Sequence, residues 1–448
     1  MRKIQVPDFR KFLAENPKEI FSLLGRFGAV DHKGRYLHWA DFRRRVPTDI
    51  DPLAAWAATK LSRMSLLKTL ELVAENDQPF RYCTPDALES VLHLIDRLCA
   101  PLLNERDSAL VGQSERNRYL VESLMMEEAI SSAQLEGAAT TRKVAKEMLE
   151  NERPPRSEDE RMIFNNYLLM KETKRRKDEP LSLELICALH AIATDATESP
   201  NVQPGELRRS DDIVVGGRDG EVVHRPPAFV SLAQRLERLC VFANTRHDGR
   251  EGRAFIHPAI KAIILHFMLG YEHPFADGNG RTARALFYWL MLKQGYWPFE
   301  YISISRLLKE APIQYGESYL FSKSDEFDLT YFIVYQAGII QRAVEQFLEY
   351  LERRRREQLE LMLWLDEQGI GEKLNYRQGQ LLRKVLRHPG RLFSVKEVKN
   401  EFGVAENTAR TDLQTLARFK VLTPTREGKS VYYIARGDAV EQLKKTAR

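Results

Sequence analysis

The twelve residues HPFADGNGRTAR, His273 to Arg284, carry most of what the sequence says about fold and function. They lead directly into an apolar helical pattern, so they predict a loop followed by a helix N-terminus. Gly278 and Gly280 permit backbone conformations that other residues avoid, and successive N–H groups can then point into one concavity. Because the helix dipole adds positive potential at the same place, this shape favours a bound phosphate.

The side chains of this stretch are typical of phosphate chemistry. Asp277 offers a hard oxygen to magnesium, an ion that bridges phosphates and needs only one or two protein carboxylates. Arg281 and Arg284 are three residues apart, so both can bind phosphate oxygens from one helix face. His273 can accept a proton from an attacking hydroxyl as a neutral imidazole. Each residue alone is more often structural, but together they indicate a catalytic site.

The same stretch resembles the signature of Fic-domain proteins, His-x-Phe-x-(Asp/Glu)-Gly-Asn-Gly-Arg-x-x-Arg, at every specified position. The preceding FIHPAIKAIILHFMLGYE, residues 255–272, resembles the helix that leads into this loop in the family. The resemblance implies transfer of a nucleoside monophosphate, usually AMP from ATP with magnesium, onto a Ser, Thr or Tyr hydroxyl of a target protein. A related kinase-like branch has Lys in place of the second glycine, and Gly280 argues against that branch.

The resemblance also implies a role for each matching residue. The implied roles are a base for His273, a buried anchor for Phe275, a magnesium ligand for Asp277, the anion hole for Gly278, Asn279 and Gly280, phosphate binding for Arg281 and γ-phosphate binding for Arg284. An adenine-binding aromatic residue is less well defined. Tyr315 and Tyr319 lie where the family often places aromatic residues, and either can instead belong to the core.

A second motif precedes the loop and resembles the family's inhibitory motif, (Ser/Thr)-x-x-x-Glu-(Gly/Asn). Ser132, Glu136 and Gly137 match it, as in the class whose inhibitory helix is N-terminal to the catalytic core. Residues four apart share a helix face, and a carboxylate aimed at Arg284 would occupy the place of the γ-phosphate. Some members use this glutamate to position a water that removes AMP again, and de-AMPylation stays open here. The alternative is that Glu136 is a surface residue.

A hairpin is expected around residues 213–225. Two short β-branched runs flank Gly216 to Gly220 in DDIVVGGRDGEVVHRPP. In Fic-domain proteins such a hairpin, or flap, holds a target segment by β-strand addition. The resemblance therefore implies a target protein as the partner of this hairpin. The alternative is an ordinary surface hairpin.

The C-terminal part of the chain is its basic part. Residues 371–448 hold 17 Lys and Arg against 8 Asp and Glu, a net charge of +9, whereas the whole chain has +5. Such a segment indicates a polyanion as its partner, with a solvated surface as the alternative. Elsewhere the composition is that of a globular chain, without an apolar run of membrane-spanning length or a secretory signal. Four widely spaced cysteines indicate neither disulfides nor zinc, so we expect a cytoplasmic protein that does not bind membranes.

Residues 374–448 follow the order of a winged helix-turn-helix domain. Helices are expected at 376–388, 394–402 and 405–419, followed by two strands around Glu427 and Gly428. In that fold the third helix contacts base edges and the wing contacts phosphates, which implies double-stranded DNA as a partner. The candidate DNA contacts are Asn407, Thr408, Arg410 and Thr411 on the helix, with Arg426 and Lys429 on the wing. The alternative is a protein–protein module.

Together these features predict a mainly α protein: a Fic-type helical core with a small β-hairpin flap, plus the winged helix-turn-helix domain. The expected parts are an N-terminal helical region (1–112), a catalytic domain (113–350), a linker helix (351–373) and the C-terminal domain (374–448). The predicted function is a protein adenylyltransferase acting on a target or on itself and inhibited by Glu136. The alternative is a DNA-binding transcriptional regulator whose nucleotidyl-transfer site is vestigial or transfers a different group. A homodimer is left open.

Apolar spacing also predicts individual elements. Helices are expected from 119 to about 136 and at 228–244, 258–271, 283–294 and 329–365, and Ser157 is expected to cap another. A further hairpin is expected where Lys33 and Gly34 could turn the chain between Val30 and Leu37.

Overall fold

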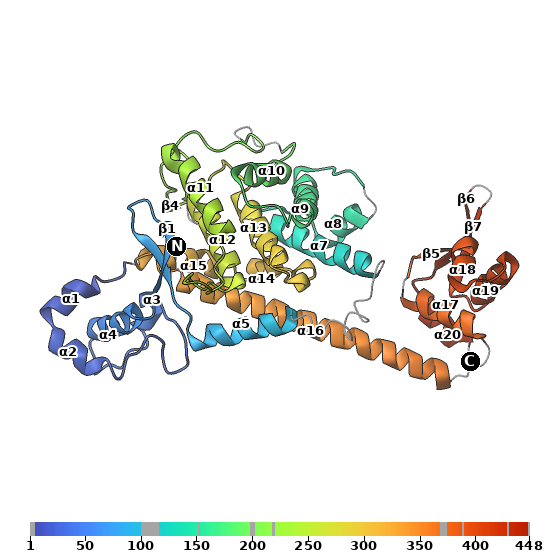
Figure 1. The fold of residues 1–448 in the computed structure, drawn as a ribbon, viewed down its shortest axis with the longest axis horizontal. Coiled ribbons are helices and arrows are strands. Elements are labelled where there is room, and N and C mark those ends of the chain that lie inside the picture. The colour runs from blue at the N-terminus through green and yellow to red at the C-terminus, as the bar shows by residue number, and fades with distance from the viewer. Residues whose placement is uncertain are drawn as a thin grey trace. The chain divides into compact units, whose positions relative to one another are not determined.

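Apolar residues at helical spacing dominate the chain, and the computed structural model is accordingly mainly helical (Figure 1), which confirms the predicted fold class. The structure describes residues 5–99, 116–150, 153–197, 202–216, 220–367, 374–387, 389–427 and 430–446. Contacts divide the chain into two units, Met1–Phe347 and Leu348–Arg448. Among the described helices, none combines the length and the apolar character that crossing a membrane requires.

The first unit begins with short helices and a two-stranded sheet. These elements are α1 (Phe9–Glu15), α2 (Pro17–Leu23), α3 (Trp39–Phe42), α4 (Pro52–Met64), β1 (Lys68–Val73), β2 (Pro79–Tyr82) and α5 (Asp86–Cys99). Trp39, Phe42 and Trp56 pack together in the core of this part. Burial of each large aromatic side chain stabilises the fold by roughly 1.5–3 kcal/mol.

The hairpin predicted at Lys33 and Gly34 is wrong, because residues 30–37 contain no strand. The Asp31 carboxylate instead accepts hydrogen bonds from the backbone N–H groups of Lys33 and Arg35, at 2.9 Å each. This side chain satisfies the turn locally, so the flanking residues need no partner strand. The two-stranded sheet of this part is formed by β1 and β2, which pair antiparallel.

The rest of the first unit contains the predicted loop. Its elements are α7 (Arg116–Leu135), α8 (Arg142–Glu150), α9 (Glu158–Arg175), α10 (Leu183–Ala193), β3 (Val215–Gly216), β4 (Val222–His224), α11 (Phe229–Asn244), α12 (Pro258–Glu272), α13 (Asn279–Lys293), η2 (Trp297–Glu300), α14 (Ile304–Glu310), α15 (Pro312–Ser324) and α16 (Thr330–Glu367), which continues into the second unit. The Ser157 hydroxyl caps α9, as predicted, by accepting from the Glu160 N–H at 3.2 Å. Cys83, Cys187 and Cys240 are free thiols.

Helices α12 and α13 are buried along almost their whole length. They pack against each other, α9 and α10 pack on α13, and α11 packs on α12 (Figure 1). A helix that is buried on all sides needs neighbouring elements on each of its faces. The loop between α12 and α13 therefore starts and ends on two firmly held helices.

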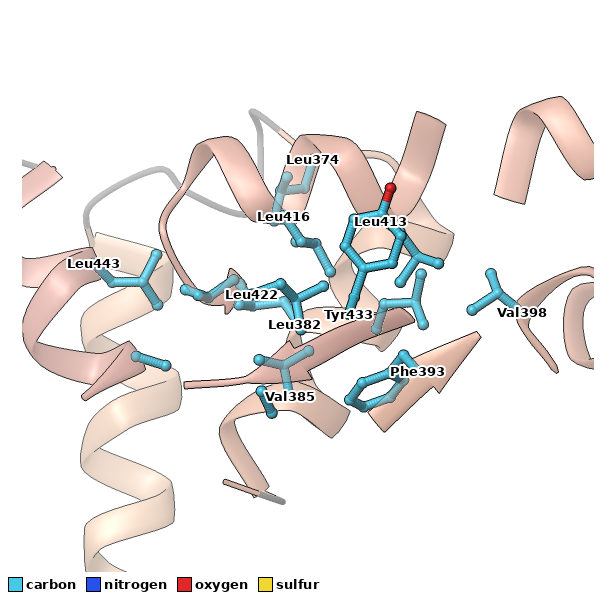
Figure 2. Close-up of a cluster of buried hydrophobic side chains, with 14 of the residues drawn as sticks. Leu374, Leu382, Val385, Phe393, Val398, Leu413, Leu416, Leu422, Tyr433 and Leu443 are labelled. Atoms are coloured by element: carbon cyan, nitrogen blue, oxygen red, sulfur yellow. The ribbon is translucent and has the colours of Figure 1, made fainter. Parts of the chain in front are cut away.

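The second unit has a hydrophobic core of its own (Figure 2). Its remaining elements are α17 (Tyr376–Arg387), β5 (Leu392–Ser394), α18 (Val395–Phe402), α19 (Glu406–Arg418), β6 (Leu422–Glu427), β7 (Ser430–Ala435) and α20 (Ala439–Thr446). The strands form an antiparallel sheet in the order β5-β7-β6. Leu382, Leu413 and Phe393 come from different elements and meet in the core. The predicted helices and hairpin occur in the predicted order, and the winged-helix classification stays a prediction.

Candidate active site

The loop after α12 begins with a sharp change of backbone direction at His273. This residue has left-handed dihedral angles, φ 43° and ψ 59°, and its N–H donates to the Leu269 carbonyl at 3.0 Å. The buried Arg208 holds the turn, since its Nε donates to the His273 carbonyl at 3.1 Å and its backbone N–H donates to the Pro274 carbonyl at 2.8 Å. The strained backbone at His273 is thus stabilised by contacts from a separate segment.

The Asn279 side chain closes the loop. Its Oδ1 accepts from the Phe275 N–H at 3.0 Å, and its Nδ2 donates to the Phe275 carbonyl at 2.8 Å. Phe275 is fully buried, as an anchor would be. Because the Asn279 amide is engaged within the loop, its contribution to an anion hole would come from its backbone N–H. The first N–H groups of a helix lack partners within the helix, and those of α13 can bind an anion.

Burial favours the neutral form of the His273 imidazole. Burial lowers the pKa of His273, against the opposing effects of a hydrogen bond to the Gly270 backbone and of the Glu136 carboxylate. A ring nitrogen that donates to a carbonyl leaves the second nitrogen with a lone pair. The half-buried His273 can therefore act as a base.

Asp277 and Arg281 lie side by side at the start of α13. The Arg281 Nη2 and the Asp277 Oδ2 are 3.1 Å apart, while the Arg281 Nη1 donates to the Ala193 carbonyl at 2.5 Å. The Asp277 side chain is 49% exposed, whereas that of Arg281 is fully buried. One exposed carboxylate beside an anion-binding helix end suits magnesium, which takes its other ligands from water and phosphate. The described residues contain no cluster of three or more metal-ligating side chains.

Glu136 and Ser132 surround the second arginine of the motif. The Glu136 Oε1 lies 2.8 Å from the Arg284 Nη1, and the Arg284 Nε donates to the Ser132 hydroxyl at 2.9 Å. A β-carbon on Gly280 would overlap the Glu136 carboxylate, so this carboxylate lies directly against the first turn of α13. It follows α7, which ends at Leu135, and Gly137 continues the chain at φ 109°. The structure thus brings Ser132 and Glu136 to the predicted loop.

Tyr315 lies in the same neighbourhood, on α15. Its hydroxyl and the buried His266 Nε2 are 2.8 Å apart. Burial raises the pKa of Tyr315, and the nearby Arg284 opposes that shift. The phenol is therefore a neutral hydrogen-bonding group next to the Arg284 guanidinium. Tyr319 packs beside it with ring centroids 5.5 Å apart.

The predicted hairpin is present and is attached to the end of α12. Val215 of β3 pairs with His224 of β4 in an antiparallel register. The His224 Nε2 donates to the Tyr271 carbonyl at 2.7 Å, and its Nδ1 accepts from the Lys323 ammonium at 2.9 Å. This anchor lies two residues before His273, so the hairpin adjoins the candidate base. Residues 217–219 lie outside the described part of the chain.

Sequence reasoning missed His190, a fully buried residue of α10. Its Nε2 contacts the Asp277 carbonyl at 2.9 Å, and its ring stacks on Phe275 with centroids 3.6 Å apart. Burial lowers the pKa of His190 to about 4. A histidine within the apolar pattern of residues 181–193 was the available signal, but it did not indicate which loop the ring would contact.

The candidate DNA-contacting residues lie on α19 and β6. Asn407, Arg410 and Thr411 are exposed and Thr408 is half-buried. The Arg410 Nη2 pairs with the Glu406 Oε1 at 2.9 Å. Two further candidates belong to the hairpin. Arg426 is exposed, and Lys429 lies outside the described residues.

Comparison with known proteins identifies the region around the loop. Residues 180–291 match the Fic/DOC family. The protein adenylyltransferase Fic of Drosophila sechellia is 36% identical over 97 residues, which cover 22% of this chain and 17% of that protein. The same protein of Drosophila melanogaster matches equally. The chain thus spans less than a fifth of the length of these curated relatives.

Solved structures of Fic proteins also align with the chain. A Fic family protein from Desulfovibrio desulfuricans G20 aligns with a TM-score of 0.49 and 16% identity, covering 79% of this chain and 96% of that one. Fic-1 (residues 134–508) from C. elegans aligns with a TM-score of 0.46 and 15% identity, covering 77% and 85%.

Gly278→Ala should destabilise the first unit more than Gly295→Ala. Both glycines have positive φ, 77° and 82°, where an alanine costs about 1–2 kcal/mol. Only at Gly278 would the new methyl group also meet other atoms, Thr194 Cγ2 at 2.8 Å and the His190 ring at 3.2 Å, whereas Gly295 is open. We expect the unfolding free energy of Gly278→Ala, from urea denaturation, to fall by about 1 kcal/mol more. Equal losses would show that the loop does not pack closely against α10.

Proposed function

We propose that this chain is a protein adenylyltransferase that moves AMP from ATP to a hydroxyl side chain of a target protein or of itself, and that Glu136 inhibits it. One observation carries the proposal: a neutral His273 and the N-terminus of α13 share a loop, and the Glu136 carboxylate pairs with Arg284 beside that N-terminus. A carboxylate against an arginine and free N–H donors occupies a place suited to a phosphate. The Fic match and the adenylyltransferase relatives support AMP as the transferred group.

In the proposed reaction the target hydroxyl oxygen attacks the α-phosphorus of ATP. A bond forms between these two atoms, the bond from the α-phosphorus to the bridging oxygen breaks, and pyrophosphate leaves. The hydroxyl proton moves to the ring nitrogen of His273 that carries a lone pair. The backbone N–H groups at the start of α13 stabilise the charge that develops on the phosphate oxygens. Asp277 would hold magnesium, which would neutralise charge on the phosphates.

Inhibition follows from the position of the glutamate. Arg284 is fully buried, and in this arrangement its guanidinium contacts Glu136 and Ser132. A γ-phosphate that needs the same guanidinium must displace the carboxylate, since both carry negative charge. ATP bound without this contact would lack the alignment that in-line attack needs. Removal of the Glu136 side chain leaves Ser132 in place and frees one face of Arg284.

Glu136→Gly should increase labelling of the protein or a target by ATP carrying ³²P in the α-phosphate. The reason is that Arg284 becomes available to the γ-phosphate. The double variant Glu136→Gly, His273→Ala should lose the label by about 10²-fold or more, since proton transfer by a side chain contributes that much. Autoradiography and intact-mass measurement, with AMP as the expected increment, check both results.

Glu127→Ala is the matched control for the inhibitory residue. Glu127 lies on α7, the helix that Glu136 directly follows, but its carboxylate pairs with the exposed Arg142 at 2.6 Å. The Glu127→Ala variant should therefore be labelled to the same extent as the unsubstituted protein. Activation by this control would point to general loosening of α7, and an active double variant would contradict the assignment of His273 as base.

The labelling rate of the Glu136→Gly variant should depend on pH through His273. Burial lowers the pKa of this imidazole below its usual 6.5, and loss of the Glu136 carboxylate lowers it further. The ring is the active base when neutral, so the rate should stay level above pH 7 and fall only as the pH drops through a value below 6.5. Initial rates between pH 5 and 8 test this, and a midpoint above pH 7 would argue against it.

For the second unit we propose binding to double-stranded DNA. The face of α19 that carries Asn407, Arg410 and Thr411 is exposed and polar, while Leu413 and Leu416 fill the core from the other face. The polar face of α19 is therefore not required for the core of this unit. The positive net charge of residues 371–448 favours a polyanion as the binding partner.

Fluorescence anisotropy of the full chain with duplex DNA tests this second proposal. We expect affinity to fall steeply with salt, and Arg426→Ala, on the hairpin that would contact phosphates, to reduce the log–log slope by about one. Arg246→Ala, an exposed change in the first unit, should leave the slope unaltered. Absence of binding to duplex DNA at low salt would exclude the proposal.

A further inference from the structure

We propose that His190 is a positioning residue that fixes the Asp277–Gly278 peptide, so that the Gly278 N–H faces the phosphate of the nucleotide. The inference rests on the proposed function, since it concerns the same loop. It assigns a specific role to a side chain of α10, outside the loop motif itself.

The hydrogen bonds of His190 determine which ring nitrogen carries its proton. The backbone N–H of Gly205 donates to the Nδ1 at 3.0 Å, so this nitrogen has the lone pair. In the neutral ring the proton is then on Nε2, which donates to the Asp277 carbonyl at 2.9 Å. The two contacts together leave one tautomer and one ring orientation.

The bond to the Asp277 carbonyl orients the next N–H group. The peptide bonds of the described residues are trans, and in a trans peptide the carbonyl and the N–H point in opposite directions. Since the Asp277 carbonyl points to His190, the Gly278 N–H points away from α10. The carbonyl of the following peptide, Gly278–Asn279, accepts the first helical bond of α13, from the Thr282 N–H at 3.0 Å. The Asp277–Gly278 peptide is therefore held by α10 at its own carbonyl, and the peptide after it is held by α13.

Further contacts hold the loop against the end of α10. The His190 ring lies parallel to the Phe275 ring, with an interplanar angle of 2°. The Thr194 methyl group closes over Gly278 from the same side, and the Arg281 guanidinium donates to the Ala193 carbonyl. His190 is the member of this group that determines a peptide orientation, because it alone among them bonds to the Asp277 carbonyl in the described structure.

Two substitutions separate the two hydrogen bonds of His190. In His190→Gln the amide nitrogen can occupy the place of Nε2 and still donate to the Asp277 carbonyl, while the bond from Gly205 is lost. In His190→Asn the amide oxygen can occupy the place of Nδ1 and keep the Gly205 bond, while the bond to Asp277 is lost. Both lose the ring that packs on Phe275, so we expect similar falls in melting temperature.

Made in the Glu136→Gly background, the two variants should differ in nucleotide binding. We expect the Kd for ATP, from calorimetry, to rise about tenfold in His190→Asn, as loss of one aligned hydrogen bond implies. In His190→Gln it should rise by less than about threefold. The control is His38→Asn, which changes a buried histidine of the N-terminal part with the same pattern: Nδ1 accepts from the Ala40 N–H at 3.3 Å and Nε2 contacts the Ser324 hydroxyl. This control should lower stability and leave the Kd unchanged.

A readout without nucleotide keeps the inference separate from the proposed function. The sequence contains Asp–Gly pairs at 219–220, 248–249 and 277–278, so ¹³C-carbonyl aspartate with ¹⁵N-glycine isolates these peptides in an NMR spectrum. The Asp277 carbonyl resonance should move in His190→Asn and stay near its original position in His190→Gln. Equal shifts, or equal losses of ATP affinity, in the two variants would overturn the inference. Failure of the Glu136→Gly parent to label or bind ATP would overturn the proposed function, while the carbonyl resonance would still test His190.

Discussion

The structure depends on one constraint: α13 begins at the centre of a helical bundle with N–H groups that no helical carbonyl can satisfy. The helix is buried along almost its whole length, yet its first turn needs polar partners. Gly278 and Gly280 keep that turn open, and in this arrangement the Glu136 carboxylate lies against it. The N-terminus of α13 favours a negatively charged partner, and a carboxylate or a phosphate can fill that place. This property suits both phosphate binding and inhibition by a carboxylate.

The residues that hold this end come from segments distant in the chain. Arg208 supports the backbone at His273, His190 and Ala193 hold the far side of the loop, and α7 supplies Glu136. Helix α7 is itself attached through Glu128, a buried carboxylate that accepts from the Ser303 hydroxyl at 2.7 Å and from the Ser305 N–H at 3.1 Å. The Glu136 carboxylate therefore follows directly after a helix that has a second polar anchor about two turns earlier.

Local signals explain where sequence reasoning succeeded. Apolar periodicity predicted α11 and α12 to within a few residues, and serine caps marked the starts of α9 and α18. The prediction from apolar periodicity placed the start of α13 too late, because Gly278 and Asn279 are not apolar. It expected a hairpin at Lys33 and Gly34, where the Asp31 side chain closes a turn without strands. The sheet β1–β2 was not predicted, although its two strands are consecutive in the chain and pair with each other. The strand β5 was not predicted either, since its residues acquire strand geometry only by pairing with β7, much further along the chain.

By itself the sequence determined the chemistry available to this protein. Twelve consecutive residues specify a base, a carboxylate, two arginines and a glycine-containing helix start, because their spacing alone places them within one loop and one turn. Only the tertiary structure decided how these groups are held and what opposes them. Asn279 turned out to bond within the loop and Arg281 to face α10, and the Glu136 carboxylate meets Arg284 across 148 positions of the chain. Such contacts depend on how buried helices pack against one another, and no local pattern of residues contains that information.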